Sequence, residues 1–209
     1  MLKVLIADDH EIVRRGLKQI LLEEFPFTHI EEASDTKTLV EKAIAGKWDI
    51  ILSDLAMPGG GGLDAVRQIR QQNITVPVLI LSIYPEDQYA LRVIKAGAAG
   101  YLNKDAAPEE LINAIQRILS GKRHISETVA ELLSLSLHQA DETPLHELLS
   151  EREYKVFRLI AEGKSNAAIA EELLIGCTTV STYRSRILNK MNKKNNAELI
   201  QYAIENGLI

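Results

Sequence analysis

The segment WDIILSDLAMPGGGGLDAVRQIRQQ, residues 48–72, holds the pattern that decides the fold of this chain. Its apolar run 48–53 predicts a buried strand, and apolar residues recur at helical spacing over 62–72. Between them stand Asp54, a Met-Pro pair and four glycines. Glycines after a strand can bind phosphate through backbone N–H groups, whereas an aspartate can attack phosphorus directly. The segment therefore indicates either a nucleotide-binding loop or chemistry at Asp54.

The same strand–loop–helix unit recurs throughout the first 121 residues. Near-continuous apolar strands that alternate with amphipathic helices are typical of a parallel sheet covered on both faces, an α/β fold. The predicted strands are 2–7, 29–33, 48–53, 77–82 and 98–103, and the predicted helices are 12–24, 38–46, 62–72, 86–97 and 108–121.

Polar side chains stand where four of these strands end. Asp8 and Asp9 follow the first strand, Asp54 the third, Ser82 ends the fourth and Lys104 follows the fifth. The carboxyl ends of parallel strands meet at one edge, so we expect these groups to converge. Carboxylates suit Mg²⁺, an aspartate can accept a phosphoryl group, and a lysine and a hydroxyl can bind its oxygens. Each residue alone is more often an ordinary strand-end or helix-cap residue, but the five together favour phosphoryl transfer.

Composition limits the class of protein. With 209 residues, 46% of them hydrophobic, the chain is long enough for two small domains. It has no apolar run near the roughly 20 residues of a membrane helix, and its first residues do not resemble a signal peptide. We therefore expect a cytoplasmic protein with no membrane partner. The one cysteine, Cys177, excludes an intrachain disulfide and is more typical of a small structural residue than of a redox sensor.

The last third of the chain predicts helices only. The net charge of −5 argues weakly against nucleic-acid binding, but residues 175–196 carry five basic residues and no acid. Ser150 and Glu153 form the sequence pattern of a capping box at a helix start. A tight link between the second and third of four short helices is typical of a helix-turn-helix module. These predicted helices are 150–163, 165–174, 178–191 and 196–208, and a further helix is predicted over 125–139, before the polar stretch 140–144.

The helix predicted over 178–191 has two distinct faces. Val180, Ile187 and Met191 form an apolar face that we expect to pack on the neighbouring helices. The opposite face is a ridge of small polar residues with basic flanks, which suits a DNA major groove, although a solvated amphipathic helix is the alternative. The candidate DNA-contact residues are Thr178, Ser181, Thr182, Arg184, Ser185, Arg186, Asn189, Lys190, Lys193 and Lys194.

Two independent sets of motifs carry a family resemblance. ADDH (7–10), SDLAMPG (53–59), LILS (79–82) and GYLNKDA (100–106) resemble the signature segments of a response-regulator receiver domain. LSEREYKVFRLIAEGKSNAAIAEEL (149–173) and TTVSTYRSRIL (178–188) resemble a LuxR-type helix-turn-helix. Together they resemble the NarL/FixJ class of two-component response regulators. The resemblance implies a flavodoxin-like (βα)5 receiver domain over 1–121, a linker with a helix over 122–145 and a four-helix DNA-binding domain over 146–209.

The resemblance also implies roles for single residues. Asp54 would accept a phosphoryl group from a sensor histidine kinase, which would promote formation of a homodimer and binding of double-stranded promoter DNA. Mg²⁺ would be held by Asp9, Asp54, the carbonyl of Ala56 and, through water, Asp8. Ser82 and Lys104 would bind the phosphoryl oxygens, and Tyr101 would be the aromatic residue that rotates inward on phosphorylation. The helix 196–208 would serve dimerisation.

The DNA-binding segment departs from the family pattern in two places. Positions 178, 181 and 185 often carry a Lys or Arg in the family, whereas here they are Thr178, Ser181 and Ser185. We therefore expect fewer direct base contacts and more dependence on DNA shape. Gly176 and Cys177 replace a usual Ser-Pro pair, so the helix lacks a standard N-cap unless Thr178 caps it.

Two other functions compete with a phosphorylated regulator. A phosphohydrolase would need a second acid near its nucleophile, and position 56 is an alanine, so we expect no enzyme and only slow self-dephosphorylation. A small-molecule-sensing LuxR-type regulator would need a ligand pocket but not the five strand-end residues. The glycine run lacks the Gly-Lys-Ser/Thr of a P-loop, and we expect Gly60 and Gly61 to make the loop more mobile.

Overall fold

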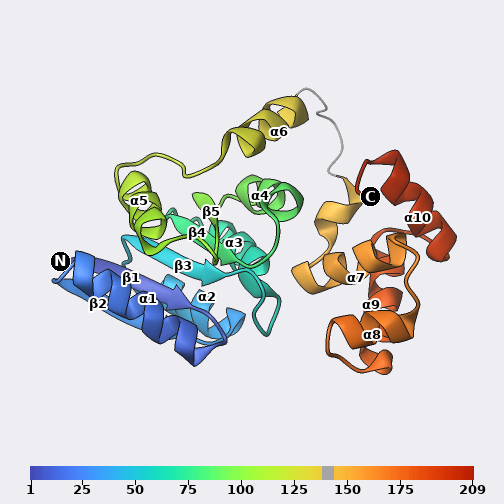
Figure 1. Cartoon of the computed structure of the whole chain (residues 1–209), viewed down its shortest axis with the longest axis horizontal. Helices are drawn as coiled ribbons and strands as arrows, with labels where there is room; N and C mark the ends of the chain where they lie inside the picture. The colour runs from blue at the N-terminus through green and yellow to red at the C-terminus, as the bar shows by residue number, and fades with distance from the viewer. Residues whose placement is uncertain (138–143) are drawn as a thin grey trace. The chain divides into compact units, whose positions relative to one another are not determined.

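The computed structural model describes residues 1–137 and 144–209, which form two compact units, Met1–Ala140 and Asp141–Ile209 (Figure 1). Each unit has its own secondary structure and its own buried hydrophobic residues. Most of the predicted polar stretch 140–144, and the last two residues of the predicted helix 125–139, lie outside the described residues.

The first unit contains a parallel five-stranded sheet in the order β2-β1-β3-β4-β5. This confirms the predicted α/β fold, and each strand lies within two residues of its predicted bounds. The order reverses between β1 and β3, which is the position where sheets of this kind bind ligands. The strands are β1 (Leu2–Ala7), β2 (Thr28–Ala33), β3 (Ile50–Asp54), β4 (Val78–Ser82) and β5 (Gly100–Asn103).

Helices cover both faces of this sheet (Figure 1). On one face α1 and α5 contact each other, and on the other α2 contacts α3 and α3 contacts α4. The helix α6 packs on α4 within the same unit. The helices are α1 (Glu11–Glu24), α2 (Thr36–Ala45), α3 (Gly61–Gln71), α4 (Glu86–Lys95), α5 (Pro108–Leu119) and α6 (Glu127–Leu137).

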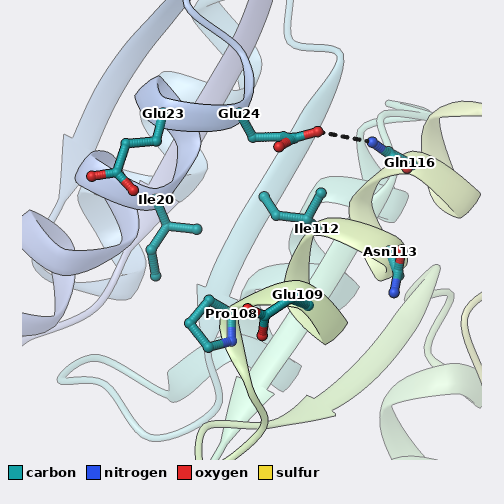
Figure 2. A pocket seen from close by; sticks show the side chains of 8 residues that line it. All are labelled: Ile20, Glu23, Glu24, Pro108, Glu109, Ile112, Asn113 and Gln116. Carbon is teal, nitrogen blue, oxygen red and sulfur yellow. Dashed lines mark hydrogen bonds between the residues drawn. The ribbon is translucent and has the colours of Figure 1, made fainter.

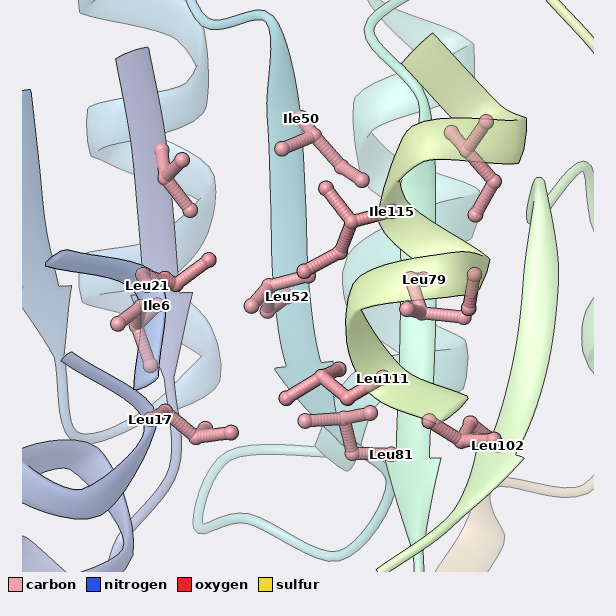
Figure 3. Packing of buried hydrophobic residues seen from close by; sticks show 13 residues of the cluster. Ile6, Leu17, Leu21, Ile50, Leu52, Leu79, Leu81, Leu102, Leu111 and Ile115 are labelled. Carbon is pink, nitrogen blue, oxygen red and sulfur yellow. The ribbon is translucent and has the colours of Figure 1, made fainter. Parts of the chain in front are cut away.

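The core under α1 and α5 is made of alternate strand residues (Figure 3). Ile6 and Leu52 point toward Leu17 and Leu21 of α1, and Ile115 of α5 fills the space beside them. Each fully buried aliphatic side chain contributes about 1.5–3 kcal/mol relative to exposure. This packing holds the strands in register, and so fixes where their polar ends lie.

The last two glycines of the run, Gly61 and Gly62, begin α3, and Gly59 and Gly60 lie in the loop before it. Gly59, Gly60 and Gly61 have φ values of 91°, 127° and 81°, a region that side chains with a Cβ rarely adopt. Gly61 and Gly62 are buried as the first residues of α3, and a Cβ on Gly62 would collide with the backbone oxygen of Asp54. The glycines therefore let α3 approach the end of β3 closely.

The second unit is all-helical, as predicted. The predicted capping box is present, because Ser150 accepts from the N–H of Glu153 and the Glu153 side chain accepts from the N–H of Ser150. The short helix η1 was not predicted from the sequence. Thr178 does not cap α9, because Gly176 occupies the N-cap position and Thr178 lies inside the helix. The elements are η1 (Leu145–Leu148), α7 (Glu151–Ala161), α8 (Asn166–Glu172), α9 (Cys177–Lys190) and α10 (Asn196–Glu205).

Among the residues that the structure describes, no helix combines the length and apolar character required to cross a bilayer.

The close approach of Gly62 to β3 predicts a stability effect. Gly62→Ala should lower the free energy of unfolding of the first unit by about 1–3 kcal/mol, because the backbone must shift to admit the methyl group. Urea denaturation followed by fluorescence measures this effect, since the only tryptophan, Trp48, lies in the first unit.

Gly16, on the exposed surface of α1, provides the control for this substitution. No described atom lies within 4 Å of a Cβ built there. Gly16→Ala should therefore stabilise the first unit by about 0.5–1 kcal/mol through helix propensity. Equal midpoints for Gly62→Ala and wild type would contradict the close approach.

Candidate functional site

The carboxyl edge of the sheet brings the five predicted strand-end residues together. Parallel pairing places Ala7 beside Ser53, Asp54 beside Leu81, and Ser82 beside Asn103. The residues of this acidic edge are mostly withdrawn from solvent. They are Asp8 and Asp9 after β1, Asp54 at the end of β3, Ser82 at the end of β4 and Lys104 after β5.

Lys104 joins two of the carboxylates of the acidic edge. Its Nζ lies 2.5 Å from Oδ2 of Asp8 and 2.7 Å from Oδ1 of Asp54. Its backbone N–H donates to the carbonyl of Ser82 at 2.8 Å, which fixes the start of the β5–α5 loop. Asp8 is 1% exposed and Asp54 6%, so the ammonium balances negative charge that water reaches poorly.

Burial and charge shift the pKa values of this pair. Burial raises the pKa of Asp54 above its ordinary value, and the neighbouring charge of Asp8 adds to this, against the lowering effect of Lys104. Burial alone would lower the pKa of Lys104, but its hydrogen bonds to Asp54 and Asp8 outweigh it, so the pKa is raised. Lys104 therefore stays an ammonium, and Asp54 is a carboxylate in a site that favours neutralising it.

Arg14 of α1 supports Asp8, and the sequence patterns did not single it out. Its Nη1 donates to the Asp8 carbonyl at 2.8 Å, and its Nε donates to Glu32 of β2 at 3.0 Å. The N–H of His10 donates to Oδ1 of Asp8 at 2.8 Å. These contacts fix the β1–α1 loop and so orient the first carboxylate of the acidic edge.

The oxygens of the acidic edge fit a Mg²⁺ ion. Oδ1 of Asp9 is buried and has no hydrogen-bond partner among the described residues, although Nδ1 of His10 lies 2.8 Å away. Asp8, Asp9 and His10 each offer a ligand atom within 4.8 Å of the others. Oδ2 of Asp54 accepts from the N–H of Ala56 at 3.1 Å. Oxygen-rich, partly dehydrated groups of this kind are the ligands that Mg²⁺ prefers.

Ser82 and Tyr101 both bind the backbone of Tyr84. The Tyr84 N–H donates to Oγ of Ser82 at 3.0 Å, and the Tyr101 hydroxyl donates to the Tyr84 carbonyl at 2.7 Å. Ser82 is fully buried and Tyr101 is 2% exposed. Tyr84 was not predicted as a site residue, yet it connects the two residues that were predicted to sense the phosphoryl group.

The chain that follows α5 pairs with the strand of Tyr101. The Tyr101 N–H donates to the His124 carbonyl at 3.3 Å, and the His124 N–H donates to the Ala99 carbonyl at 2.9 Å. Gly100 permits this, because a Cβ there would lie only 2.8 Å from the His124 oxygen. The start of the predicted linker is therefore part of the edge of the sheet.

A separate groove between α1 and α5 does not resemble a phosphate site (Figure 2). It has a volume of about 610 Å³ and an apolar wall that includes Ile20 and Ile112. The carboxylates of Glu23, Glu24 and Glu109 also line it. Three acids repel an anionic ligand, so phosphoryl chemistry is favoured at the acidic edge, where Lys104 lies.

In the second unit, α9 has the two faces that the sequence predicts. Val180, Ile187 and Met191 are fully buried. The hydroxyls of the polar ridge donate to carbonyls one turn earlier, as Ser181 does to Cys177 at 3.1 Å and Ser185 does to Ser181 at 3.1 Å. The Ser181 hydroxyl also accepts from the side-chain amide of Asn166 at 3.4 Å. The exposed ridge residues are Thr178, Ser181, Thr182, Ser185 and Asn189, and Cys177 is exposed beside them.

The cations around α9 fall into two groups. Nζ of Lys190 lies 2.6 Å from the buried Oε2 of Glu153, and Nε of Arg184 donates to Asn196 at 2.6 Å. Lys193 lies over the ring of Tyr202, 5.4 Å from its centroid. These three cations bind within the unit, whereas Arg186 and Lys194 have exposed side chains beside the ridge.

Comparisons with known proteins match both units. Residues 4–116 match the response regulator receiver domain, and residues 147–203 match the bacterial regulatory proteins of the luxR family. Response regulator UvrY of Escherichia coli strain K12 is 37% identical over 209 residues, which are 100% of this chain and 96% of UvrY. Response regulator GacA of Pseudomonas aeruginosa strain PAO1 is 34% identical over 211 residues, covering 100% of this chain and 98% of GacA.

A solved structure shares the architecture. RcsB from Salmonella enterica serovar Typhimurium, bound to promoter P1flhDC in the presence of the phosphomimetic BeF3⁻, aligns with a TM-score of 0.58 and 26% identity. The alignment covers 96% of this chain and 97% of that chain.

The Glu153–Lys190 pair predicts a pH-dependent stability. Burial would raise the pKa of Glu153, but the hydrogen bond from Lys190 and those of Ser150 hold it below the ordinary value of 4.5. A carboxyl with a lowered pKa in the folded state stabilises the fold above its ordinary pKa, and this stabilisation is lost as the pH falls through the folded value. Glu153→Gln should therefore destabilise the second unit at pH 7 by about 1–2 kcal/mol. This value lies between the typical costs of removing one partner of an exposed ion pair and of a buried ion pair. Urea denaturation followed by circular dichroism measures this.

The difference from wild type should shrink as the pH falls below 4.5. Glu162→Gln, which alters the half-exposed pair of Glu162 and Lys164 in the same unit, is the control and should change stability by less than about 1 kcal/mol. The fluorescence midpoint of Trp48 should not move in either variant, since Trp48 lies in the first unit. A pH-independent effect of Glu153→Gln would contradict the ion pair.

Proposed function

The chain belongs to the NarL/FixJ class of two-component response regulators, and we propose that Asp54 accepts the phosphoryl group that controls DNA binding through α9. The observation that carries this proposal is the placement of Lys104 between Asp8 and Asp54 at the carboxyl edge of the sheet. That edge combines a nucleophile, a fixed cation and the unsatisfied Oδ1 of Asp9 in one partly desolvated place.

In the proposed reaction, an Asp54 carboxylate oxygen attacks the phosphorus of a phosphohistidine on a sensor histidine kinase. A P–O bond forms and the P–N bond breaks, its electron pair stays on the departing imidazole nitrogen, and that nitrogen takes a proton from water. Lys104 then turns from the Asp54 carboxylate to the new phosphoryl oxygens. Asp8, Asp9, Asp54 and the Ala56 carbonyl would hold Mg²⁺, which supplies neutralisation of phosphoryl charge when bound.

We propose that the signal leaves the site through Tyr84. A phosphoryl oxygen accepts from the O–H of Ser82, and this charged acceptor attracts the hydroxyl strongly. As the hydroxyl turns toward it, the bond that its oxygen accepts from the Tyr84 N–H changes. The Tyr84 backbone then moves, and Tyr101, whose hydroxyl binds the Tyr84 carbonyl, moves with it. The strand of Tyr101 pairs with the His124 segment, so the change reaches the chain that leads to α6.

For DNA recognition we propose that the polar ridge of α9 enters the major groove. The side chains of Ser181, Thr182 and Ser185 would present oxygens to base edges, and Arg186 and Lys194 would bind phosphates. Lys190 and Arg184 already bind within the unit, so we expect fewer phosphate contacts than the number of basic residues around α9 suggests. Recognition would then depend more on DNA shape. RcsB was solved bound to promoter DNA.

Dimerisation is proposed for α10. Its Ile204 is 63% exposed, while Leu199 and Ala203 of the same helix are buried against the unit. An exposed isoleucine on a packed helix suits contact with a second copy. RcsB was solved as two dimers on two parallel DNAs.

The remaining assignments follow from the same proposal. The chain is a transcription regulator and not an enzyme, with slow loss of the phosphoryl group to water, because Ala56 offers no acid or base beside Asp54. Its partners, a kinase histidine and chromosomal DNA, place it in the cytoplasm. The boundaries 1–121, 122–145 and 146–209 for receiver, linker and DNA-binding domain are part of the proposal.

Acetyl phosphate labelling combined with DNA binding tests the proposed function. Wild type should take up one phosphoryl group and bind DNA more tightly at fixed salt, whereas Asp54→Asn should do neither. The gain is expected to be about 5- to 150-fold, the usual range for coupling between two sites. Phosphate uptake by Asp54→Asn, or unchanged DNA affinity of phosphorylated wild type, would contradict the proposal.

A further inference from the structure

Thr36, the first residue of α2, holds the loop that follows Asp54. Its hydroxyl accepts from the N–H of Gly61 at 2.9 Å, and its own N–H donates to the Pro58 carbonyl at 3.0 Å. Thr36 is 1% exposed. One buried residue therefore binds both ends of the segment 58–61, of which Gly61 lies 25 positions farther along the chain.

The hydroxyl of Thr36 is not needed to cap its own helix. Asp35 is the N-cap of α2, and its Oδ1 accepts from the N–H of Thr38 at 2.8 Å. The Thr38 hydroxyl also binds Asp35, at 2.8 Å. The partner of the Thr36 hydroxyl is instead the glycine loop, so this contact serves the loop and not α2.

The loop itself has little to define its shape. Gly59, Gly60 and Gly61 have a positive φ in succession, and glycine has more backbone freedom than any other residue. A Cβ on Gly59 would lie 3.4 Å from Cβ of Thr36, so the two backbones pack closely. Contacts from outside the run must therefore supply its order.

The same loop carries backbone groups of the acidic edge. The Ala56 N–H donates to Oδ2 of Asp54, and the Gly62 N–H donates to the Leu55 carbonyl at 2.9 Å. The loop is thus closed at Leu55 and Gly62 and fixed to α2 at Pro58 and Gly61. Between these contacts lies Ala56, whose carbonyl is the proposed backbone ligand for Mg²⁺.

We propose that Thr36 is a positioning residue for phosphoryl acceptance, which sets the Mg²⁺ affinity of the acidic edge by fixing the glycine loop. This inference rests on the proposed function of Asp54. Without the hydroxyl, the buried N–H of Gly61 loses its acceptor, and the loop moves to find another. Ala56 then no longer stays in the position that the metal requires.

Thr36→Val tests the inference, because valine keeps the shape of threonine and removes the hydroxyl, which accepts from the Gly61 N–H and donates to the Gly61 carbonyl at 3.4 Å. In the full chain, the Kd for Mg²⁺ measured by calorimetry should rise about tenfold, as for other supporting residues of metal sites. Thr36→Ser, which keeps the hydroxyl, should bind within about twofold of wild type. Thr38→Val removes a hydroxyl on the same turn that binds only Asp35, and should leave the Kd unchanged.

A second readout follows the loop itself. In wild type, Mg²⁺ should slow hydrogen exchange at the Gly61 amide, and this test is available even if Thr36→Val does not fold. Unchanged hydrogen exchange of the Gly61 amide on adding Mg²⁺, or a folded Thr36→Val with wild-type Mg²⁺ affinity, would overturn the proposed role of Thr36. Neither result would contradict the proposed function of Asp54. If wild type bound no Mg²⁺ and accepted no phosphoryl group from acetyl phosphate, the proposed function itself would fail.

Discussion

The ammonium of Lys104, held between Asp8 and Asp54, is the interaction on which the rest of the structure depends. Two carboxylates buried at one sheet edge repel each other, and removing one partner of a buried ion pair typically costs about 3–5 kcal/mol. The strand order makes the contact of Lys104 with both carboxylates possible. β1 and β3 are neighbours, and β4 and β5 follow β3 in the same sheet. In the proposed reaction, the same contact holds the Asp54 carboxylate in position until the phosphoryl group is attached to it.

Two further sets of contacts lead away from this pair in different directions. On one side, Ser82 and Tyr101 hold Tyr84, and the strand of Tyr101 pairs with the chain at His124. On the other, Ala56 binds the Asp54 carboxylate and belongs to a loop that Thr36 fixes. The first set suits the transmission of a change, and the second suits the maintenance of the site.

The sequence predicted most of the fold because its physical signals are local. Apolar runs such as 77–82 are too short for helices and too apolar for exposed loops, and the capping box at Ser150 fixed the start of α7. The strand-end position of Asp8, Asp54 and Lys104 then followed from the geometry of parallel sheets. The helix η1 was not predicted because its four residues are too few to show a helical spacing of apolar residues.

Contacts between distant residues were not predictable in this way. Lys190 was grouped with the DNA-contact cations because a count of charges does not show that Glu153 lies 2.6 Å from its ammonium. Thr36 and Arg14 gave no motif, since the role of each comes from contacts with residues that are distant in the sequence. The sequence placed Gly60 and Gly61 in the loop after Asp54, whereas Gly61 is the first residue of α3 and its N–H donates to the hydroxyl of Thr36.

Mapping the phosphoryl group to a single residue tests the central claim most directly. Wild-type protein would be treated with acetyl phosphate and Mg²⁺, the acyl phosphate reduced with borohydride, and the modified residue located by peptide mass spectrometry. The account predicts modification at Asp54, with Asp8 and Asp9 unmodified. Modification at Asp8 or Asp9, or at a residue outside the acidic edge, would contradict it.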